Sequence, residues 1–217
     1  MLEHRDYPEM SIEVAIHGRG GQGVKTTGDL LVYSLFAAGY RVNGQPLYGG
    51  ERMGAPVIYF LRFNRSGETI YDRSLVRRPQ IMLIFDTSML RSGTVSTAGL
   101  AAGGLLLLNS RKAAAEFAHL GPYRIVTIPA SQIAKECGMV RGNVPILSPV
   151  MAGAFARITG LISMETLEKT VAKVAGDLAA DRVEGNFVGL RRGFEAVEPV
   201  AGAFSAGEGG SDHGRGN

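Results

Sequence analysis

An apolar run that breaks into a cluster of glycines constrains the fold of this 217-residue chain more than any other feature. Residues 12–17, IEVAIH, predict a buried β-strand, and four glycines follow directly: Gly18, Gly20, Gly21 and Gly23. Glycine tolerates a left-handed backbone and lets a ligand approach the N–H groups closely, and the next helix presents its positive end. The sequence therefore predicts a strand, a glycine-rich turn suited to an anion, and a helix.

The turn matches two known nucleotide motifs only in part. Gly18, Gly20 and Gly23 have the spacing of the dinucleotide fingerprint, which also requires an acidic residue about 20 positions later, at the end of the second strand. Residues 40–43 read Tyr-Arg-Val-Asn and carry no carboxylate. A phosphate loop would need lysine where Val24 stands. An anion-binding turn, a nucleotide-binding regulatory module and a turn without a ligand all stay open.

A second loop, residues 45–56 (QPLYGGERMGAP), is too glycine-rich to form core and carries an aromatic residue and a charge pair. Loops of this kind commonly make contacts to ligands or partners. Residues 17–80 contain nine Lys or Arg against four Asp or Glu. This local excess of positive charge favours either a site for a phosphorylated ligand or a basic surface that faces another subunit.

The remaining pattern alternates strands with helices. Buried strands are expected at 80–86, 104–109 and 123–128, and residues 55–63 are expected to form an antiparallel hairpin with 69–71. After Ser131 the pattern becomes helical. We therefore predict an α/β fold, a three-layer α/β/α arrangement with a mixed, mostly parallel sheet and a helical C-terminal part.

Several polar residues stand at expected element ends. Asp86 and Asn109 end two strands, either at a ligand-binding edge of the sheet or as ordinary loop-starting residues. Ser163, Asn143 and Asn186 are expected to cap helices, because their side-chain oxygens can accept from unpaired N–H groups.

Composition limits the classes of protein. Cys137 is the single cysteine, which excludes a disulfide framework and indicates a reducing compartment. No run reaches the roughly 18–20 apolar residues that span a bilayer. A net charge of +3 without a Lys/Arg-rich segment does not indicate nucleic-acid binding. We expect a cytoplasmic protein that binds neither membrane nor nucleic acid.

Taken together, the motifs resemble the gamma subunit of the pyruvate/2-oxoacid:ferredoxin oxidoreductase family. The resemblance rests on GRGGQGVKTTGDLL, on YGGERMGAPV about 30 residues later, on IMLIFD, and on segments that begin GNVPILSPV and EGNFVGL. It covers residues 11–198, which we expect to form the gamma domain, between an N-terminal extension at 1–10 and a flexible Gly/Ser-rich tail at 199–217. Met53 departs from the family, since many members have a second arginine there.

The resemblance implies a subunit of an enzyme that oxidatively decarboxylates a 2-oxoacid, transfers the acyl group to coenzyme A and passes electrons to ferredoxin or a similar acceptor. The chain has no Gly-Asp-Gly motif for thiamine diphosphate and too few cysteines for an iron–sulfur cluster. Thiamine diphosphate, Mg and [4Fe-4S] clusters are therefore expected in partners: thiamine-binding alpha and beta subunits and a ferredoxin-like delta subunit. The 2-oxoacid itself stays open.

By the same resemblance, this chain binds no cofactor alone, carries no catalytic residue and no metal ligand, and helps to enclose coenzyme A. The candidate contacts in the first loop and helix are Gly18, Arg19, Gly20, Gly21, Gln22, Gly23 and Lys25. Those in the second loop are Tyr48, Gly50, Glu51 and Arg52.

Overall fold

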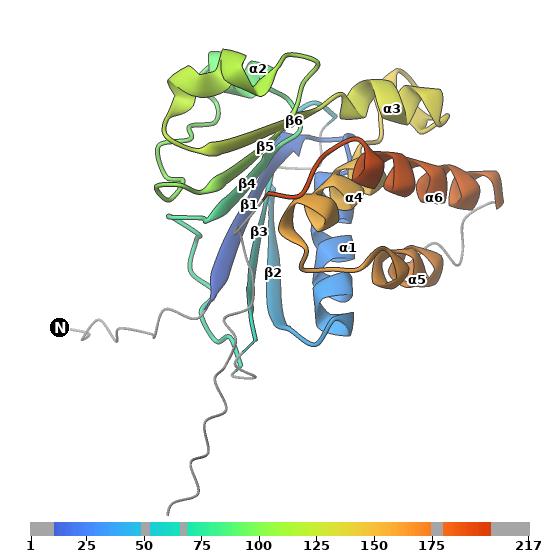
Figure 1. Ribbon diagram of the computed structural model, residues 1–217, viewed down its shortest axis with the longest axis horizontal. Helices are drawn as coiled ribbons and strands as arrows, with labels where there is room; N and C mark the ends of the chain where they lie inside the picture. Colours follow the sequence, from blue (N-terminus) through green and yellow to red (C-terminus); the bar gives the residue numbers. More distant parts are fainter. Residues whose placement is uncertain (1–10, 49–52, 66–68, 175–179, 201–217) are drawn as a thin grey trace, which may run out of the picture.

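A mixed six-stranded sheet forms the centre of the computed structural model, which describes residues 11–48, 53–65, 69–174 and 180–200 (Figure 1). The strands are β1 (Ile12–Arg19), β2 (Arg41–Tyr48), β3 (Pro56–Asn64), β4 (Ile81–Ile84), β5 (Leu105–Asn109) and β6 (Arg124–Ile128). Their order is β2-β3-β1-β4-β5-β6. β1, β4, β5 and β6 run parallel, whereas β3 pairs antiparallel with both β1 and β2.

The helices lie mainly on one face of the sheet, with shorter elements on the other (Figure 1). They are α1 (Val24–Ala37), α2 (Ser88–Arg91), α3 (Ala130–Glu136), α4 (Ser148–Thr159), α5 (Met164–Val174) and α6 (Ala180–Glu195), with the 3₁₀ helix η1 (Ala114–Leu120). A small second sheet pairs β7 (Val140–Arg141) with β8 (Val144–Pro145).

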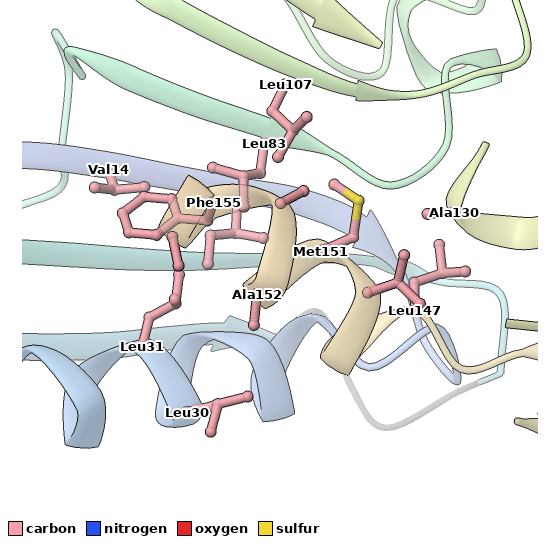
Figure 2. Packing of buried hydrophobic residues seen from close by; sticks show 14 of the residues in the cluster. Val14, Leu30, Leu31, Leu83, Leu107, Ala130, Leu147, Met151, Ala152 and Phe155 are labelled. Carbon is pink, nitrogen blue, oxygen red and sulfur yellow. The ribbon is translucent and has the colours of Figure 1, made fainter. Parts of the chain in front are cut away.

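Alternation along the strands divides the core between the two faces. Val14 of β1, Leu83 of β4 and Leu107 of β5 belong to the large cluster that α1 and α4 cover (Figure 2). Their neighbours Met82 and Leu106 point to the opposite face and form a second cluster, with Met89 and Phe117 from α2 and η1. The predicted three-layer α/β/α fold and mixed sheet are confirmed, with a third layer built from short elements.

Helix α4 occupies the centre of the thicker layer. Met151, Ala152 and Phe155 are fully buried, and Phe155 lies close to Val14 and Leu31 in Figure 2. The run of small residues that the sequence shows here lets neighbouring helices approach closely. The contact between α4 and α6 is correspondingly extensive.

Strand β2 forms one edge of the sheet, and its sequence suits that position. Pro46 lacks an N–H group, which is tolerated on an edge strand because one side of the strand has no neighbour. Gly44 is required by packing, since a Cβ there would lie 2.4 Å from the hydroxyl of Tyr59. The sequence of β2 thus fits both its free edge and its packing against Tyr59 of β3.

The expected hairpin between 55–63 and 69–71 is wrong. β3 has β1 on one side and β2 on the other, so no edge is left for Thr69–Tyr71, which form no strand. The segment that follows instead crosses the sheet face opposite α1. Arg62, on β3, donates to Glu13 Oε1 at 2.7 Å and to the Ser74 carbonyl at 2.8 Å, and so fixes this segment to the sheet.

Two of the three expected caps are also wrong. Asn143 lies in the turn between β7 and β8, and Asn186 lies inside α6 rather than before it. Ser163 does cap α5: its Oγ accepts from Thr166 N at 3.1 Å. Among the described residues, no helix has the length and apolar character needed to cross a membrane.

Candidate functional site

The glycine loop joins β1 to α1 at the carboxyl end of the parallel strands. Gly21 and Gly23 have φ values of 93° and 90°, in the left-handed region that favours glycine. At position 18 glycine is needed for packing, because a Cβ there would lie 2.6 Å from Val24 Cγ2 and 2.8 Å from Phe85 Cβ. The loop therefore depends on glycine for backbone conformation at two positions and for packing at a third.

The second loop lies directly against the first. Gly20 N donates to the Ala55 carbonyl at 2.8 Å, and Gly54 N donates to the Gly20 carbonyl at 3.1 Å. These reciprocal bonds join segments that are more than thirty residues apart in the sequence. The structure thus brings together the two loops that sequence reasoning combined into one site.

Gln22 stabilises the turn from within. Its Oε1 accepts from Arg19 N at 2.8 Å, while its own N donates to the Arg19 carbonyl at 3.1 Å. Its carbonyl also accepts from Leu147 N at 2.9 Å, which connects the loop to the start of α4. The Gln22 side chain is therefore used in shaping the loop.

Arg19 spans the gap between the loops and α2. Its Nε donates to Asp86 Oδ2 at 2.7 Å, and its Nη1 donates to the Gly54 carbonyl at 3.2 Å. Asp86 also accepts from Ser88 N at 2.9 Å. Burial alone would raise the pKa of Asp86, but hydrogen bonds from Ser88 and Arg19 outweigh it and leave the pKa below its usual value. Asp86 is thus an anchor for Arg19.

The N-terminal end of α1 faces the same region. It begins after Gly23, has no acidic residue in its first turn and receives no hydrogen bond from a capping side chain among the described residues. Such a terminus attracts anions, because its N–H groups lack partners within the helix. Lys25 extends along the helix to Asp29, whose other oxygen accepts from Tyr59 Oη at 2.9 Å.

Helix α4 contributes to this site in a way that the sequence did not indicate. Ser148, in its first turn, is buried, and its Oγ would lie 3.0 Å from a Cβ at Gly23. On the other side, Met53 Cε would lie 2.7 Å from a Cβ at Gly21. No local signal links positions 23 and 148, since only the fold brings them together.

The other predicted site residues divide into two groups. Residues 45–48, expected in the second loop, belong to β2 instead, and Tyr48 ends that strand opposite Val57 of β3. Gly50, Glu51 and Arg52 lie outside the described residues. Asn109, the other strand-end residue, serves the fold: its Nδ2 donates to the Phe85 carbonyl at 2.8 Å, and its Oδ1 accepts from Ser131 N at 3.0 Å.

His17, directly before the loop, is a titratable residue that sequence reasoning did not single out. Its Nδ1 is buried and has no hydrogen-bond partner within the described part of the chain. It pairs in register with Ile58 on β3 and Ile84 on β4. Burial lowers its pKa to about 4, which keeps the imidazole neutral at neutral pH.

The arrangement offers donors to an anionic group. Backbone N–H groups, a positive helix end and a fixed arginine converge on one edge of the sheet. Within the ranges that the structure describes, no group of three or more His, Cys, Asp or Glu residues could hold a metal ion. The two loops together form a candidate site for an anionic group.

Comparison with known proteins shows a similarity that extends over most of the chain and includes both loops. Residues 13–196 match the protein family described as pyruvate ferredoxin/flavodoxin oxidoreductase. The chain is 33% identical over 193 residues to pyruvate synthase subunit PorC of Thermotoga maritima. The aligned region covers 86% of this chain and 94% of PorC. The chain is 32% identical over 191 residues to the pyruvate/ketoisovalerate oxidoreductases common subunit gamma of Pyrococcus furiosus, covering 86% and 97%.

Solved structures agree. The crystal structure of pyruvate oxidoreductase subunit PORC from Thermotoga maritima has a TM-score of 0.71 at 28% identity and covers 88% of this chain and 98% of that chain. The 2-oxoglutarate:ferredoxin oxidoreductase of Magnetococcus marinus shares the fold, with a TM-score of 0.65 at 18% identity, over 88% of this chain and 32% of that longer one. The chain therefore belongs to the pyruvate ferredoxin/flavodoxin oxidoreductase family and corresponds to its gamma subunits.

Proposed function

We propose that this chain acts as the gamma subunit of a multi-subunit oxidoreductase that converts a 2-oxoacid and coenzyme A into an acyl-CoA and CO₂. The observation that carries the proposal is the match over residues 13–196, together with relatives that are themselves named as oxidoreductase subunits and are covered almost completely. In the balanced reaction, the bond between the carbonyl and carboxylate carbons breaks, a C–S bond forms, and two electrons and one proton are released.

Other chains must hold the redox and thiamine chemistry. Thiamine diphosphate stabilises the carbanion formed on decarboxylation, and iron–sulfur clusters accept electrons one at a time. This sequence has one cysteine and no Gly-Asp-Gly motif, so we assign thiamine diphosphate, Mg and [4Fe-4S] clusters to thiamine-binding alpha and beta subunits and a ferredoxin-like delta subunit. Ferredoxin or a similar carrier is the proposed acceptor.

For this chain itself we propose a role in enclosing coenzyme A and in contacting the partner subunits. The candidate site fits a phosphate in one respect: the helix N-terminus after the glycine loop has no capping side chain among the described residues, and no acidic residue stands in its first turn. Support also comes from the Magnetococcus marinus enzyme with the same fold, which was solved with 2-oxoglutarate, coenzyme A and succinyl-CoA bound.

The proposed coenzyme A contacts fall into backbone donors, a cation and residues that already have partners. Backbone N–H groups of Gly21 and Gly23 and of the first turn of α1 are the proposed phosphate donors, and Arg52 of the second loop is the proposed cation. The N–H group of Gly20 is already bonded to the Ala55 carbonyl, so Gly20 shapes the site instead. Arg19 and Lys25 already have carboxylate partners, Asp86 and Asp29. We therefore assign Arg19 a positioning role and propose a direct ligand role for Arg52.

The first test is dependence on partners. The purified native complex should contain further chains with thiamine diphosphate and iron–sulfur absorption, and it should oxidise one of the family's 2-oxoacids in a coenzyme-A-dependent assay. The isolated chain should show no such turnover. Coenzyme-A-dependent oxidation by the isolated chain, or a native chain that is monomeric and binds NAD, would contradict the proposal and favour a nucleotide-binding regulatory module.

The second test separates ligand binding from assembly. In the complex, Arg52→Ala should raise KM for coenzyme A by roughly ten- to a hundredfold, since a charge-assisted hydrogen bond is worth about 1.5–3 kcal/mol. The decarboxylation half-reaction, which precedes acyl transfer, should stay nearly intact. A parallel fall of both half-reactions with subunit dissociation on a sizing column would show that Arg52 acts in the interface instead.

A further inference from the structure

A pocket of about 440 Å³ lies on the thinner side of the sheet, and its lining includes no residue of the glycine loop. It is formed by α2, η1 and the segments that follow β4 and β5, including Thr87 and Ser110. These segments leave the carboxyl ends of two neighbouring parallel strands, which is where open α/β sheets commonly bind ligands. The pocket thus has the position of a ligand site in its own right.

Cations are among the residues that line this pocket. Arg91 ends α2, and Arg111 follows β5, and neither has a carboxylate partner among the described residues. Lys112 and His119 add further donors, although Lys112 is paired with Glu116 at 3.1 Å. Two such guanidiniums at one pocket favour a phosphate, because the planar fork of arginine matches its oxygens.

Apolar side chains form another part of the wall. Leu90, Phe117 and Leu120 line the pocket, and Phe117 is almost fully buried in the cluster under α2 and η1. An inorganic anion would leave this wall in contact with water. The occupant that suits both parts of the lining therefore carries an anionic group on an organic body with an apolar face.

Hydrogen-bond acceptors complete the lining. Glu116 supplies a carboxylate from η1, and Thr87 and Ser110 supply hydroxyl groups from the sheet end of the pocket. These groups suit a body that itself donates hydrogen bonds, such as a ribose or an exocyclic amine. Pockets for small ligands and cofactors usually measure about 300–1,000 Å³, and 440 Å³ lies at the lower end of that range.

We propose that the pocket between α2 and η1 binds a nucleoside phosphate. Arg91 and Arg111 hold the phosphate, the wall of Leu90, Phe117 and Leu120 packs against the base, and Glu116 accepts from the sugar or the base. The nucleoside phosphate is either a free mononucleotide or the nucleotide end of a larger molecule such as coenzyme A.

The absence of tryptophan from the sequence permits a direct test on the full chain. Leu90→Trp introduces a single fluorophore into the pocket wall, and Tyr33→Trp introduces one on the exposed side of α1, across the sheet, as a control. Adenosine 5′-monophosphate should change the fluorescence of the first variant saturably and leave the second unchanged. A response confined to the Tyr33→Trp chain, or no saturable response, overturns the proposal.

The cations are tested in the Leu90→Trp background. Arg91→Gln with Arg111→Gln should weaken binding by about tenfold or more, since it removes two charge-assisted contacts. Arg77→Gln with Arg78→Gln removes the same charge from exposed positions before β4, at the opposite end of that strand, and should have no effect. Circular dichroism confirms that both double variants are folded. Equal affinity in the two double variants overturns the assignment.

Competitors identify the ligand. Inorganic phosphate that binds as tightly as the nucleotide would reduce the pocket to a simple anion site and reject the proposal, and adenosine that binds equally would reject the role of phosphate. Coenzyme A is titrated separately. A response as strong as that to the mononucleotide assigns the pocket to the nucleotide end of coenzyme A, and no response assigns it to a free nucleotide, so both outcomes support a nucleoside phosphate.

Discussion

Gly153 on α4 lies so close to the Leu190 carbonyl on α6 that a Cβ at Gly153 would approach that oxygen to 2.0 Å. The relationship is matched on the other helix, where a Cβ at Gly193 would lie 2.1 Å from the Val150 carbonyl. The two helices thus meet backbone to backbone, and neither can accept even a methyl group at the crossing.

Gly153→Ala should therefore separate α4 from α6 and destabilise the chain by about 1–3 kcal/mol, despite the better helix propensity of alanine. Denaturant unfolding measures the effect. Gly185→Ala, on α6, where the nearest neighbour of an added Cβ would lie at 3.2 Å, is the control and should be close to neutral. Equal effects from the two substitutions would refute the close-approach argument.

The glycine loop offers a comparison at matched backbone conformation. Gly21 and Gly39 have φ values of 93° and 92°, but only at Gly21 would an added Cβ meet neighbours within 4 Å. Both alanine variants should lose on the order of 1–2 kcal/mol to strain. In the assembled enzyme, only Gly21→Ala should raise KM for coenzyme A. An unchanged KM would identify the loop as an ordinary turn.

The buried imidazole of His17 predicts acid sensitivity. Its folded pKa of about 4 lies below the unfolded value of 6.5, so the unfolded chain binds more protons between these values and stability falls as the pH drops. From pH 7 to pH 5 this contribution is on the order of 2 kcal/mol. His17→Gln should flatten the fall in unfolding free energy over this interval, and an unchanged slope would assign it to other groups.

Arg19→Gln should loosen the contact between the two loops by removing the bonds to Asp86 and Gly54. Because the pair is partly exposed, a loss of about 1 kcal/mol is expected. Faster hydrogen exchange at the Gly54 amide, which donates to Gly20, is the specific readout. Lys25→Gln, at a more exposed pair, should leave that exchange rate unchanged.

Residue pattern alone predicted much of the sheet. The runs at 80–86, 104–109 and 123–128 correspond to β4, β5 and β6. β4 and β5 are buried on both faces, which needs continuous apolar sequence. β6 is an edge strand and is only partly buried before Ile128, so the expectation of a fully buried strand there was wrong. The helix after the glycine loop was predicted too, and its buried residues include Leu31 and Leu35.

The errors arose where pairing over long distance decides structure. Residues 69–71 carry a strand-like pattern, but β2 and β1 already occupy both edges of β3. Asn143 and Asn186 have the side chains of capping residues, yet tertiary contacts set the helix starts elsewhere. Local chemistry could not reveal these outcomes.

The sequence predicted the two loops of the candidate site, but it did not predict which residues elsewhere in the fold contact them. The cluster of four glycines included Gly21 and Gly23, both of which adopt the left-handed backbone. Asp86 was identified as a strand-end residue, but its hydrogen bond to Arg19 bridges 67 positions. Ser148 gave no signal, because it reaches Gly23 only through the packing of α4.

The two loops are joined through main-chain atoms, and this has a consequence for how such a subunit can diverge. Peptide N–H and carbonyl groups are present whatever side chains the loops carry, so the bonds of Gly20 to Ala55 and Gly54 constrain shape without constraining identity. A substitution at Met53 would leave both of these main-chain bonds in place. Substitutions in the loops can thereby change their side-chain chemistry without removing the bonds that join them.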